Sequence, residues 1–423
     1  MVVMRPPHLR HNVVALGADY ALFMVALAFA SPATILPAFA AWLGAPNVVI
    51  GAIPAVMTIG WFLPCLFAAP YTESLARKLP FLVRWTFAER VPLLVLAAAA
   101  YWLAERAPAA TLTLMLAMLL VLTGIGGLLM PAWMDLIGRA IPMTMRGRFF
   151  AMTSVVAAVG GLGASAIAAD LLATHRPAVA YALCFLCGTA CLLVSFVALV
   201  VVREPAATVA APATEGLGVY LRRMPALLRR DPNFAWYLAA RALGAVSGMG
   251  AAFYTVYALR AWQAPPATVG LFTALLLAGT IAGTLVLGWL ADRAGHVVVV
   301  VTGVAAAVAA NTLALGAPSL GVFGLVFVFS GVHQASLSVS GLNVLLEFAP
   351  AQREGPTYLG LGQTSLAPVA FTAPLAGGLL ADGAGFPVVF LIAALGGALA
   401  VVMLALRVRD PRHARAMGAV SRA

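Results

Sequence analysis

The chain has 423 residues, of which 63% are hydrophobic and only 9% are charged. Because soluble domains carry about 25% charged residues, this composition excludes a water-soluble globular protein and indicates that most of the chain faces lipid. The formal net charge is +11, but the basic residues are scattered over short segments between apolar runs, which argues against a nucleic-acid-binding surface.

Apolar runs of about 20 residues predict membrane-spanning helices. Twelve such runs follow one another along the chain, each bounded by Pro, Gly or charged residues. The sequence therefore predicts an all-α integral membrane protein with twelve transmembrane helices. Their approximate ranges are 12–39, 47–70, 81–103, 109–131, 148–172, 178–202, 233–259, 266–290, 297–316, 319–346, 355–380 and 386–407.

The distribution of Lys and Arg predicts the orientation of these spans. If the N-terminus is cytoplasmic, 20 of the 25 basic residues fall on the cytoplasmic side and three on the other. This asymmetry follows the positive-inside rule and predicts a multi-pass protein of the cytoplasmic (inner) membrane with both termini in the cytoplasm. Residues 28–30 also fit a signal-peptidase pattern, but cleavage there would leave eleven spans and contradict the asymmetry.

Two isolated charges, Asp19 and Arg241, lie at similar depth in the first and seventh spans, roughly 10 Å from the start of each. A charge at the centre of a bilayer costs about 2.5–3.5 kcal/mol, so each one needs a reason. We predict that the two side chains pair across a central cavity, where they hold substrate charge, a proton or only each other. The alternatives are a purely structural pair and two charges that never meet.

Glu89 and Arg90 are adjacent in the third span. Neighbouring residues point about 100° apart on a helix, so we expect the two side chains to face different helices and to form structural ion pairs there.

The fourth and fifth spans are joined by the charged stretch 133–150, which reads WMDLIGRAIPMTMRGRFF. A shift of 208 residues places it on 341–358, and the signs of the charges then differ between the copies. We predict a cytoplasmic hairpin loop in each half, whose charges form ion pairs that close the cytoplasmic face or else serve only as topological anchors. The aligned pairs are Asp135 with Asn343, Arg139 with Glu347, and Arg146 with Glu354.

The sixth span contains three cysteines in the pattern C-x-x-C-x-x-x-C, on one helix face. No His or acidic residue accompanies them, and metal sites need a supporting polar shell, so we interpret them as packing residues and predict no metal and no cofactor. The Gly-rich stretch GGLGAS lacks the Lys of a nucleotide-binding loop. The sequence contains no nucleophile–base pattern that would indicate an enzyme.

A second repeat, at an offset of 219, aligns residues 45–55 with 264–274 and brings Glu73 onto Asp292. The two repeats predict two six-span halves with the same orientation, as in proteins built from parallel repeats. We expect an N-terminal half at 1–202 and a C-terminal half at 233–407. A linker with a candidate interfacial helix (203–232) and a basic tail (408–423) complete the chain.

The tenth and eleventh spans are unusually polar and predict a water-lined cavity. Their candidate cavity residues are His333, Gln334, Asn343 and Gln363. His333 titrates near neutral pH, so it is a candidate for proton coupling, although a lone buried histidine is more often simply hydrogen-bonded.

Residues 288–296 read GWLADRAGH and resemble the signature that major facilitator superfamily transporters carry between spans eight and nine. The matching positions are Gly288, Leu290, Ala291, Asp292, Arg293 and Gly295. The resemblance implies that Asp292 caps neighbouring helix ends and pairs with Arg. The first-half counterpart, APYTESLARK with Glu73 and Arg77, is degraded. Drug–proton antiporters of the superfamily that it resembles usually carry an Arg within the fourth span and a Gly-Pro motif in the fifth. This sequence has neither, which argues against multidrug–proton antiport.

These features predict a secondary active transporter that moves a small solute by alternating access, coupled to a proton or a cation. The expected partners are a small-molecule substrate and membrane lipid, and we expect a monomer. Export and import remain open. Arg outnumbers Lys by 24 to one, which we interpret as the composition of a GC-rich bacterial genome. The alternative is a non-transporting membrane sensor or assembly protein on a transporter fold.

Parallel repeats predict that the two charged stretches lie on the same side of the membrane. In a cysteine-free background, Thr144→Cys and Gln352→Cys should react with a membrane-impermeant maleimide only in inside-out vesicles, whereas the control Glu105→Cys should react only in right-side-out vesicles. Labelling of positions 144 and 352 from opposite sides would contradict the parallel repeat.

Overall fold

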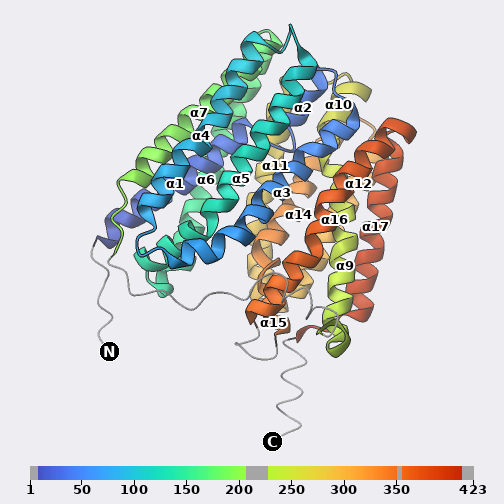
Figure 1. The fold of residues 1–423 in the computed structure, drawn as a ribbon. Coiled ribbons are helices and arrows are strands. Elements are labelled where there is room, and N and C mark those ends of the chain that lie inside the picture. The colour runs from blue at the N-terminus through green and yellow to red at the C-terminus, as the bar shows by residue number, and fades with distance from the viewer. Residues whose placement is uncertain (1–7, 206–226, 350–354, 412–423) are drawn as a thin grey trace, which may run out of the picture. The chain divides into compact units, whose positions relative to one another are not determined.

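The computed structural model describes residues 8–205, 227–349 and 355–411, and within these ranges it contains helices and turns but no strand. The side chains of a few residues inside these ranges, among them Glu73, are not described. The chain divides into two compact units (Figure 1). Unit 1 takes its residues from Met1–Ala45, Ala52–Thr214 and Pro265–Ala274, and unit 2 from Pro46–Gly51, Glu215–Ala264 and Leu275–Ala423.

The helices of the first half follow one another with short connections. They are α1 (Leu9–Phe29), α2 (Ile35–Trp42), α3 (Asn47–Ser74), α4 (Leu79–Trp102), α5 (Pro108–Ala140), α6 (Met143–Thr174) and α7 (Pro177–Val200). In unit 1, α1 packs against α6 and α7, and α4 packs against α5 and α7 (Figure 1). The buried centre of this packing includes Leu16, Leu82, Leu136 and Phe149.

The second half contains more, shorter helices. They are α9 (Pro232–Gly248), the 3₁₀ turn η1 (Met249–Ala252), α10 (Tyr254–Ala261), α11 (Thr268–Ala294), α12 (His296–Gly316), α13 (Leu320–Phe323), α14 (Leu325–Ser340), α15 (Asn343–Phe348), α16 (Gly355–Ala384) and α17 (Phe386–Arg407). In unit 2, α9 packs against α16 and α17, and α12 packs against α14 and α17. Phe234, Tyr237, Phe348 and Tyr358 form its aromatic core.

Eleven helical segments in the described part of the chain are long and apolar enough to cross a membrane. The twelfth predicted span corresponds to α4, which has 24 residues and is therefore long enough. It is not among these eleven segments because Arg84, Glu89 and Arg90 make it less apolar. The all-helical fold predicted from the apolar runs is confirmed.

The charged stretch 133–150 is not the loop that we expected. Helix α5 continues to Ala140 and α6 begins at Met143, so only Ile141 and Pro142 separate the two helices. Ile141 is extended, as the residue before a proline prefers to be. Arg and Met are good helix formers, so the helices end at this proline rather than at the edge of the apolar sequence.

The signature stretch 288–296 is also mostly helical, because α11 runs through Ala294 and α12 starts at His296. Gly295 joins them with a φ of +93°, a conformation that side chains with a Cβ rarely adopt. A Cβ there would also lie 2.4 Å from Oδ2 of Asp410. Both the positive φ at position 295 and the proximity of Asp410 therefore require a glycine there.

Three predicted spans are interrupted rather than continuous. The first breaks between α1 and α2, where Pro32 removes a backbone donor, and the seventh breaks at η1. Near the second break, a Cβ on Gly250 would meet Oδ1 of Asn311 at 2.1 Å, so that close approach requires glycine. The tenth span is divided into α13, α14 and α15. Such breaks leave backbone groups free and bend the spans.

Helices α3 and α5 approach closely through glycines. A Cβ added to Gly127 would lie 2.5 Å from the carbonyl oxygen of Trp61 and 2.6 Å from that of Gly60, whereas a Cβ added to Gly124, one turn away, would meet nothing within 4 Å. Small residues let helix backbones pack closely in membranes.

We therefore expect Gly127→Ala to destabilise the protein by about 1–3 kcal/mol, because backbone atoms cannot move aside for the new methyl group. The matched substitution Gly124→Ala should be neutral. The melting temperatures of the two purified variants in detergent measure the difference. Equal melting temperatures would show that α3 and α5 do not approach as closely as described.

Candidate functional site

A half-open pocket of about 570 Å³ lies within unit 1 and is lined by residues of α1, α3, α4, α5 and α7. Its size is typical of small-molecule sites, which are mostly apolar with a few polar groups. The aromatic side chains in its lining are Tyr20, Phe23, Trp61, Phe62 and Trp133. Three charged residues complete it, namely Asp19, Glu89 and Arg90.

Arg90 lies between the two carboxylates. One terminal nitrogen donates to Oε2 of Glu89 at 2.9 Å, and the other lies 3.6 Å from Oδ1 of Asp19. The exposed fractions are only 4% for Arg90 and 5% for each acid. Burying ions is expensive unless they are paired and hydrogen-bonded, and this arrangement supplies both. We call these three residues the buried charge cluster.

Two neutral side chains hold Asp19 in place. Ser195 on α7 donates to Oδ1 at 2.7 Å and accepts from Arg90 at 3.0 Å, and Nε1 of Trp133 on α5 donates to Oδ2 at 3.0 Å. The guanidinium of Arg90 also lies over the ring of Phe23, 5.2 Å from its centre. Its Nε has no hydrogen-bond partner. Four helices, α1, α4, α5 and α7, thus converge on one charged centre.

The geometry corrects our expectation for Glu89 and Arg90. We expected the two side chains to face different helices, but Arg90 donates to Glu89 at 2.9 Å as well as pairing with Asp19 of α1 at 3.6 Å. The 100° between neighbouring Cβ directions is overcome because both side chains are long and flexible. The sequence placed all three charges inside spans but missed that they belong together.

Asp19 finds its ion-pair partner in Arg90, within unit 1. Arg241 belongs to unit 2, where it acts electrostatically on Tyr237 and His333, and its Nε has no hydrogen-bond partner. The pairing of Asp19 with Arg241 stays a prediction.

The polar residues predicted for the tenth and eleventh spans are dispersed over unit 2. His333 makes a hydrogen bond of 2.9 Å between Nδ1 and the Gly303 carbonyl, whereas Asn343 donates to the Val339 carbonyl at the end of α14 and Gln334 is exposed. Gln363 is half-buried on α16. These residues do not line the unit 1 pocket, and their role in a cavity stays a prediction.

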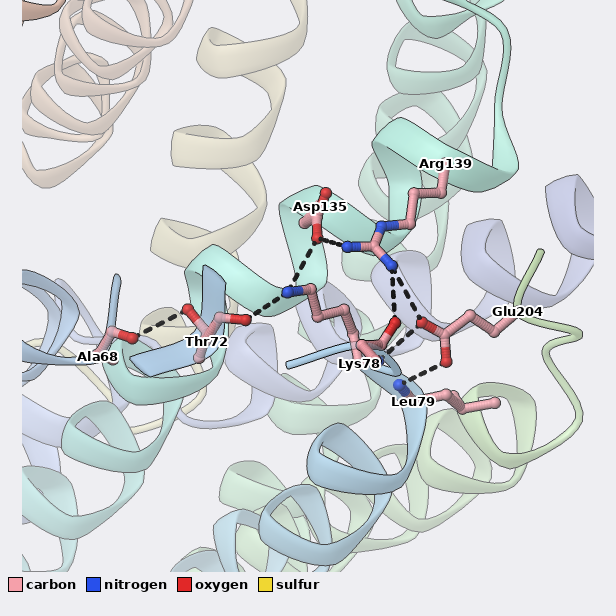
Figure 2. A network of polar contacts seen from close by, with 8 residues as sticks. Ala68, Thr72, Lys78, Leu79, Asp135, Arg139 and Glu204 are labelled. Atoms are coloured by element: carbon pink, nitrogen blue, oxygen red, sulfur yellow. Dashed lines mark hydrogen bonds and ion pairs between the residues drawn. The ribbon is translucent and has the colours of Figure 1, made fainter. Parts of the chain in front are cut away.

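A second group of charges joins the ends of α4, α5 and α7 (Figure 2). Asp135 lies 2.7 Å from Arg139 and 3.4 Å from Nζ of Lys78, which is almost fully buried and also donates to the Thr72 carbonyl. Glu204 lies 3.8 Å from Arg139. We call Lys78, Asp135, Arg139 and Glu204 the end cluster.

Glu204 caps the N-terminus of α4. Its two carboxylate oxygens accept the backbone N–H groups of Lys78 at 2.7 Å and Leu79 at 3.1 Å (Figure 2). A carboxylate is favoured at this end of a helix, where backbone donors lack partners. The sequence analysis missed Glu204 and Lys78. The signal was present in the Arg203-Glu204-Pro205 stretch that directly follows the sixth span.

The other predicted gate residues make local contacts. Arg146 donates to the carbonyls of Gly138 and Ile141 at the C-terminal end of α5, a favourable position for a cation. Glu347 lies 3.9 Å from His296, which also bonds to Ser340 at 2.9 Å. Arg77 is exposed. Glu354 and the side chain of Glu73 lie outside the described residues.

The signature residues of α11 lie at its C-terminal end. Arg293 stacks over the Trp289 ring, 4.3 Å from its centre, and Asp292 is exposed. A Cβ on Gly288 would meet nothing within 4 Å, so no neighbour requires a glycine there. The pairing of Asp292 with Arg, and ion pairs between Arg139 or Arg146 and the acids of the second half, stay predictions.

Removing Arg90 should leave two carboxylates buried without their cation. We expect Arg90→Met to destabilise the protein by about 3–5 kcal/mol, while the control Arg106→Met, at an exposed site, should have little effect. Thermal unfolding in detergent measures both. An Arg90→Met variant as stable as the parent would show that the two acids do not depend on this ion pair.

The comparisons with known proteins agree with this architecture. The Major Facilitator Superfamily model matches residues 243–420. Solved structures with the same fold include a point mutant of the nucleoside transporter NupG, with a TM-score of 0.74 and 13% identity over 93% of this chain and 98% of that one. A D-xylose-proton symporter has a TM-score of 0.67 and 13% identity over 96% and 99%.

A bacterial homologue of the iron transporter ferroportin, in its inward-facing state, has a TM-score of 0.67 and 16% identity over 94% of this chain and 98% of its own. No curated protein matches the sequence. At these identities the structural likeness shows the fold alone. The family model covers less than half of the chain, in its second half, while the solved structures share the fold over nearly all of it.

Proposed function

We propose that this protein is a secondary active transporter that moves a small solute by alternating access and couples this movement to a proton or another cation. The observation that carries the proposal is the buried charge cluster in the wall of a ligand-sized pocket. Ionisable residues inside membrane spans are costly and typically mark substrate or ion pathways.

The composition of the cluster supports cation coupling. Asp19 and Glu89 together carry two negative charges when ionised, and Arg90 supplies one positive charge. A proton or another cation at these carboxylates balances the remaining charge. The D-xylose-proton symporter among the structural neighbours indicates that this fold is compatible with proton coupling.

The helix break next to the pocket supports alternating access. Pro32 lies between α1 and α2 and also lines the pocket. Binding in the pocket can therefore act directly on a bend in the first span. With the break at η1 in the seventh span, each half contains at least one interrupted span, a common feature of transporter binding regions.

The end cluster and the signature at 288–296 are proposed gate elements on the cytoplasmic face. The cluster depends on charge pairs between helix ends, which can form in one conformation and break in another. The orientation, with both termini in the cytoplasm of a bacterium, rests on the Lys and Arg asymmetry. No nucleic acid enters this function.

Transport can be tested in proteoliposomes that contain a pH-sensitive dye, using inward gradients of a panel of organic cations, nucleosides and sugars. We expect at least one solute to move the luminal pH. Asp19→Asn should reduce the signal to that of protein-free liposomes, because it removes one carboxylate of the cluster. The control Asp170→Asn, at an exposed site on α6, should retain the signal.

A folded protein that moves neither solute nor protons under any gradient would overturn the proposal. Solute uptake without any pH change, and without dependence on Na⁺ or K⁺, would retain transport but overturn coupling. Size-exclusion chromatography of each variant in detergent confirms that a lost signal is not lost folding.

A further inference from the structure

The charge of the unit 1 pocket is unbalanced. Its charged lining residues are Asp19, Glu89 and Arg90, so the wall carries one more negative than positive charge when all three are ionised. Arg90 is shared by both acids, at 2.9 Å and 3.6 Å. Uncompensated charge is costly in such a buried place, so the pocket favours an occupant that brings a single positive charge.

The unused acceptor is on Glu89. Asp19 accepts hydrogen bonds from Ser195 and Trp133 in addition to its contact with Arg90. Glu89, in contrast, accepts a hydrogen bond from Arg90 alone among the described residues, and only through Oε2. Its Oε1 is therefore the carboxylate oxygen of the cluster that is available to a ligand.

An indole ring lies close to this oxygen. A Cβ placed on Gly126 would be 2.8 Å from Oε1 of Glu89 and 2.7 Å from the ring of Trp61. The carboxylate and the edge of the ring thus both pack tightly against α5 at this point, and only a glycine at 126 lets them do so. Trp61 also packs edge-on against Phe23, with ring centres 6.3 Å apart. The faces of aromatic rings attract cations.

Apart from Thr58 and Thr86, the rest of the lining is apolar or aromatic. Tyr20 stacks against Trp133, with ring centres 6.0 Å apart, and Met24, Met57 and Met130 also contribute to the wall. Methionine adapts its shape to irregular ligands. A hydrated inorganic ion would gain little from such a surface, whereas an organic group would replace water there favourably.

From these observations we infer that the pocket binds an amphipathic organic monocation, with its positive charge at the carboxylate of Glu89 and its apolar body against the aromatic and methionine side chains. The inference deepens the transport function proposed above and rests on it for the role of the ligand as the solute. It names the substrate class by chemistry: one positive charge on an apolar or aromatic body.

Two ions of the same size and shape but opposite charge test the inference. Tetraphenylphosphonium and tetraphenylborate can each be titrated by calorimetry into the full-length protein, in a non-ionic detergent and a sodium buffer, with protein-free detergent as the blank. We expect the cation to bind at one site per chain. The anion should bind at least about tenfold more weakly, because it meets the excess negative charge.

The variant Glu89→Gln removes the excess charge but keeps the shape of the side chain. We expect it to weaken binding of the cation by about tenfold or more, and Glu89→Asp to restore part of the affinity. The control Glu105→Gln, at an exposed site, should bind as the parent does. If Glu89→Gln does not fold, the comparison of the two ions on the parent protein still decides.

Equal affinity for the two ions, absence of cation binding to the parent, or full affinity in a folded Glu89→Gln variant would each overturn the inference. The test is independent of the transport assay. Glu89-dependent cation binding by a protein that transports nothing would retain this inference and overturn the proposed function. Transport of another solute by a protein that binds no cation would overturn this inference and retain the proposed function.

Discussion

The structure of the first unit depends on one ion-pair arrangement, in which Arg90 is held between Asp19 and Glu89 away from water. The interior of a membrane offers no water to these charges, so neighbouring helices must supply their hydrogen-bond partners. Ser195 and Trp133 do so for Asp19. Since the three charges and their two neutral partners come from four helices, the cluster also fixes how these helices pack. The pocket takes its shape from the same contacts.

The same need for partners organises the helix ends. Glu204 accepts the first backbone donors of α4, and Arg146 donates to the last carbonyls of α5. Lys78 is buried because Asp135 and a backbone carbonyl surround its ammonium group. The charges between spans therefore act as caps and clamps on specific helices. This explains why an apolar chain concentrates charge in the stretch 133–150.

Backbone requirements set the places where helices break or approach one another. Pro32 separates α1 from α2, and Gly295 turns sharply between α11 and α12. Gly127 and Gly126 allow α5 to lie close to α3, and Gly126 also lets Glu89 pack against α5. The pocket thus combines a charged centre, a nearby bend and a tight helix contact, the parts that a ligand-driven movement of a helix requires.

The sequence by itself determined the all-helical membrane fold, because apolar runs of spanning length allow no other structure in lipid. It also showed which charges lie inside spans and that two stretches repeat. It could not show that Asp19, Glu89 and Arg90 form one cluster, or that Glu204 caps α4, because these contacts join residues up to 126 positions apart. Only the tertiary structure decided those partners, because ion pairs depend on which helix faces meet. Spans that are apolar on nearly every side do not specify which faces these are.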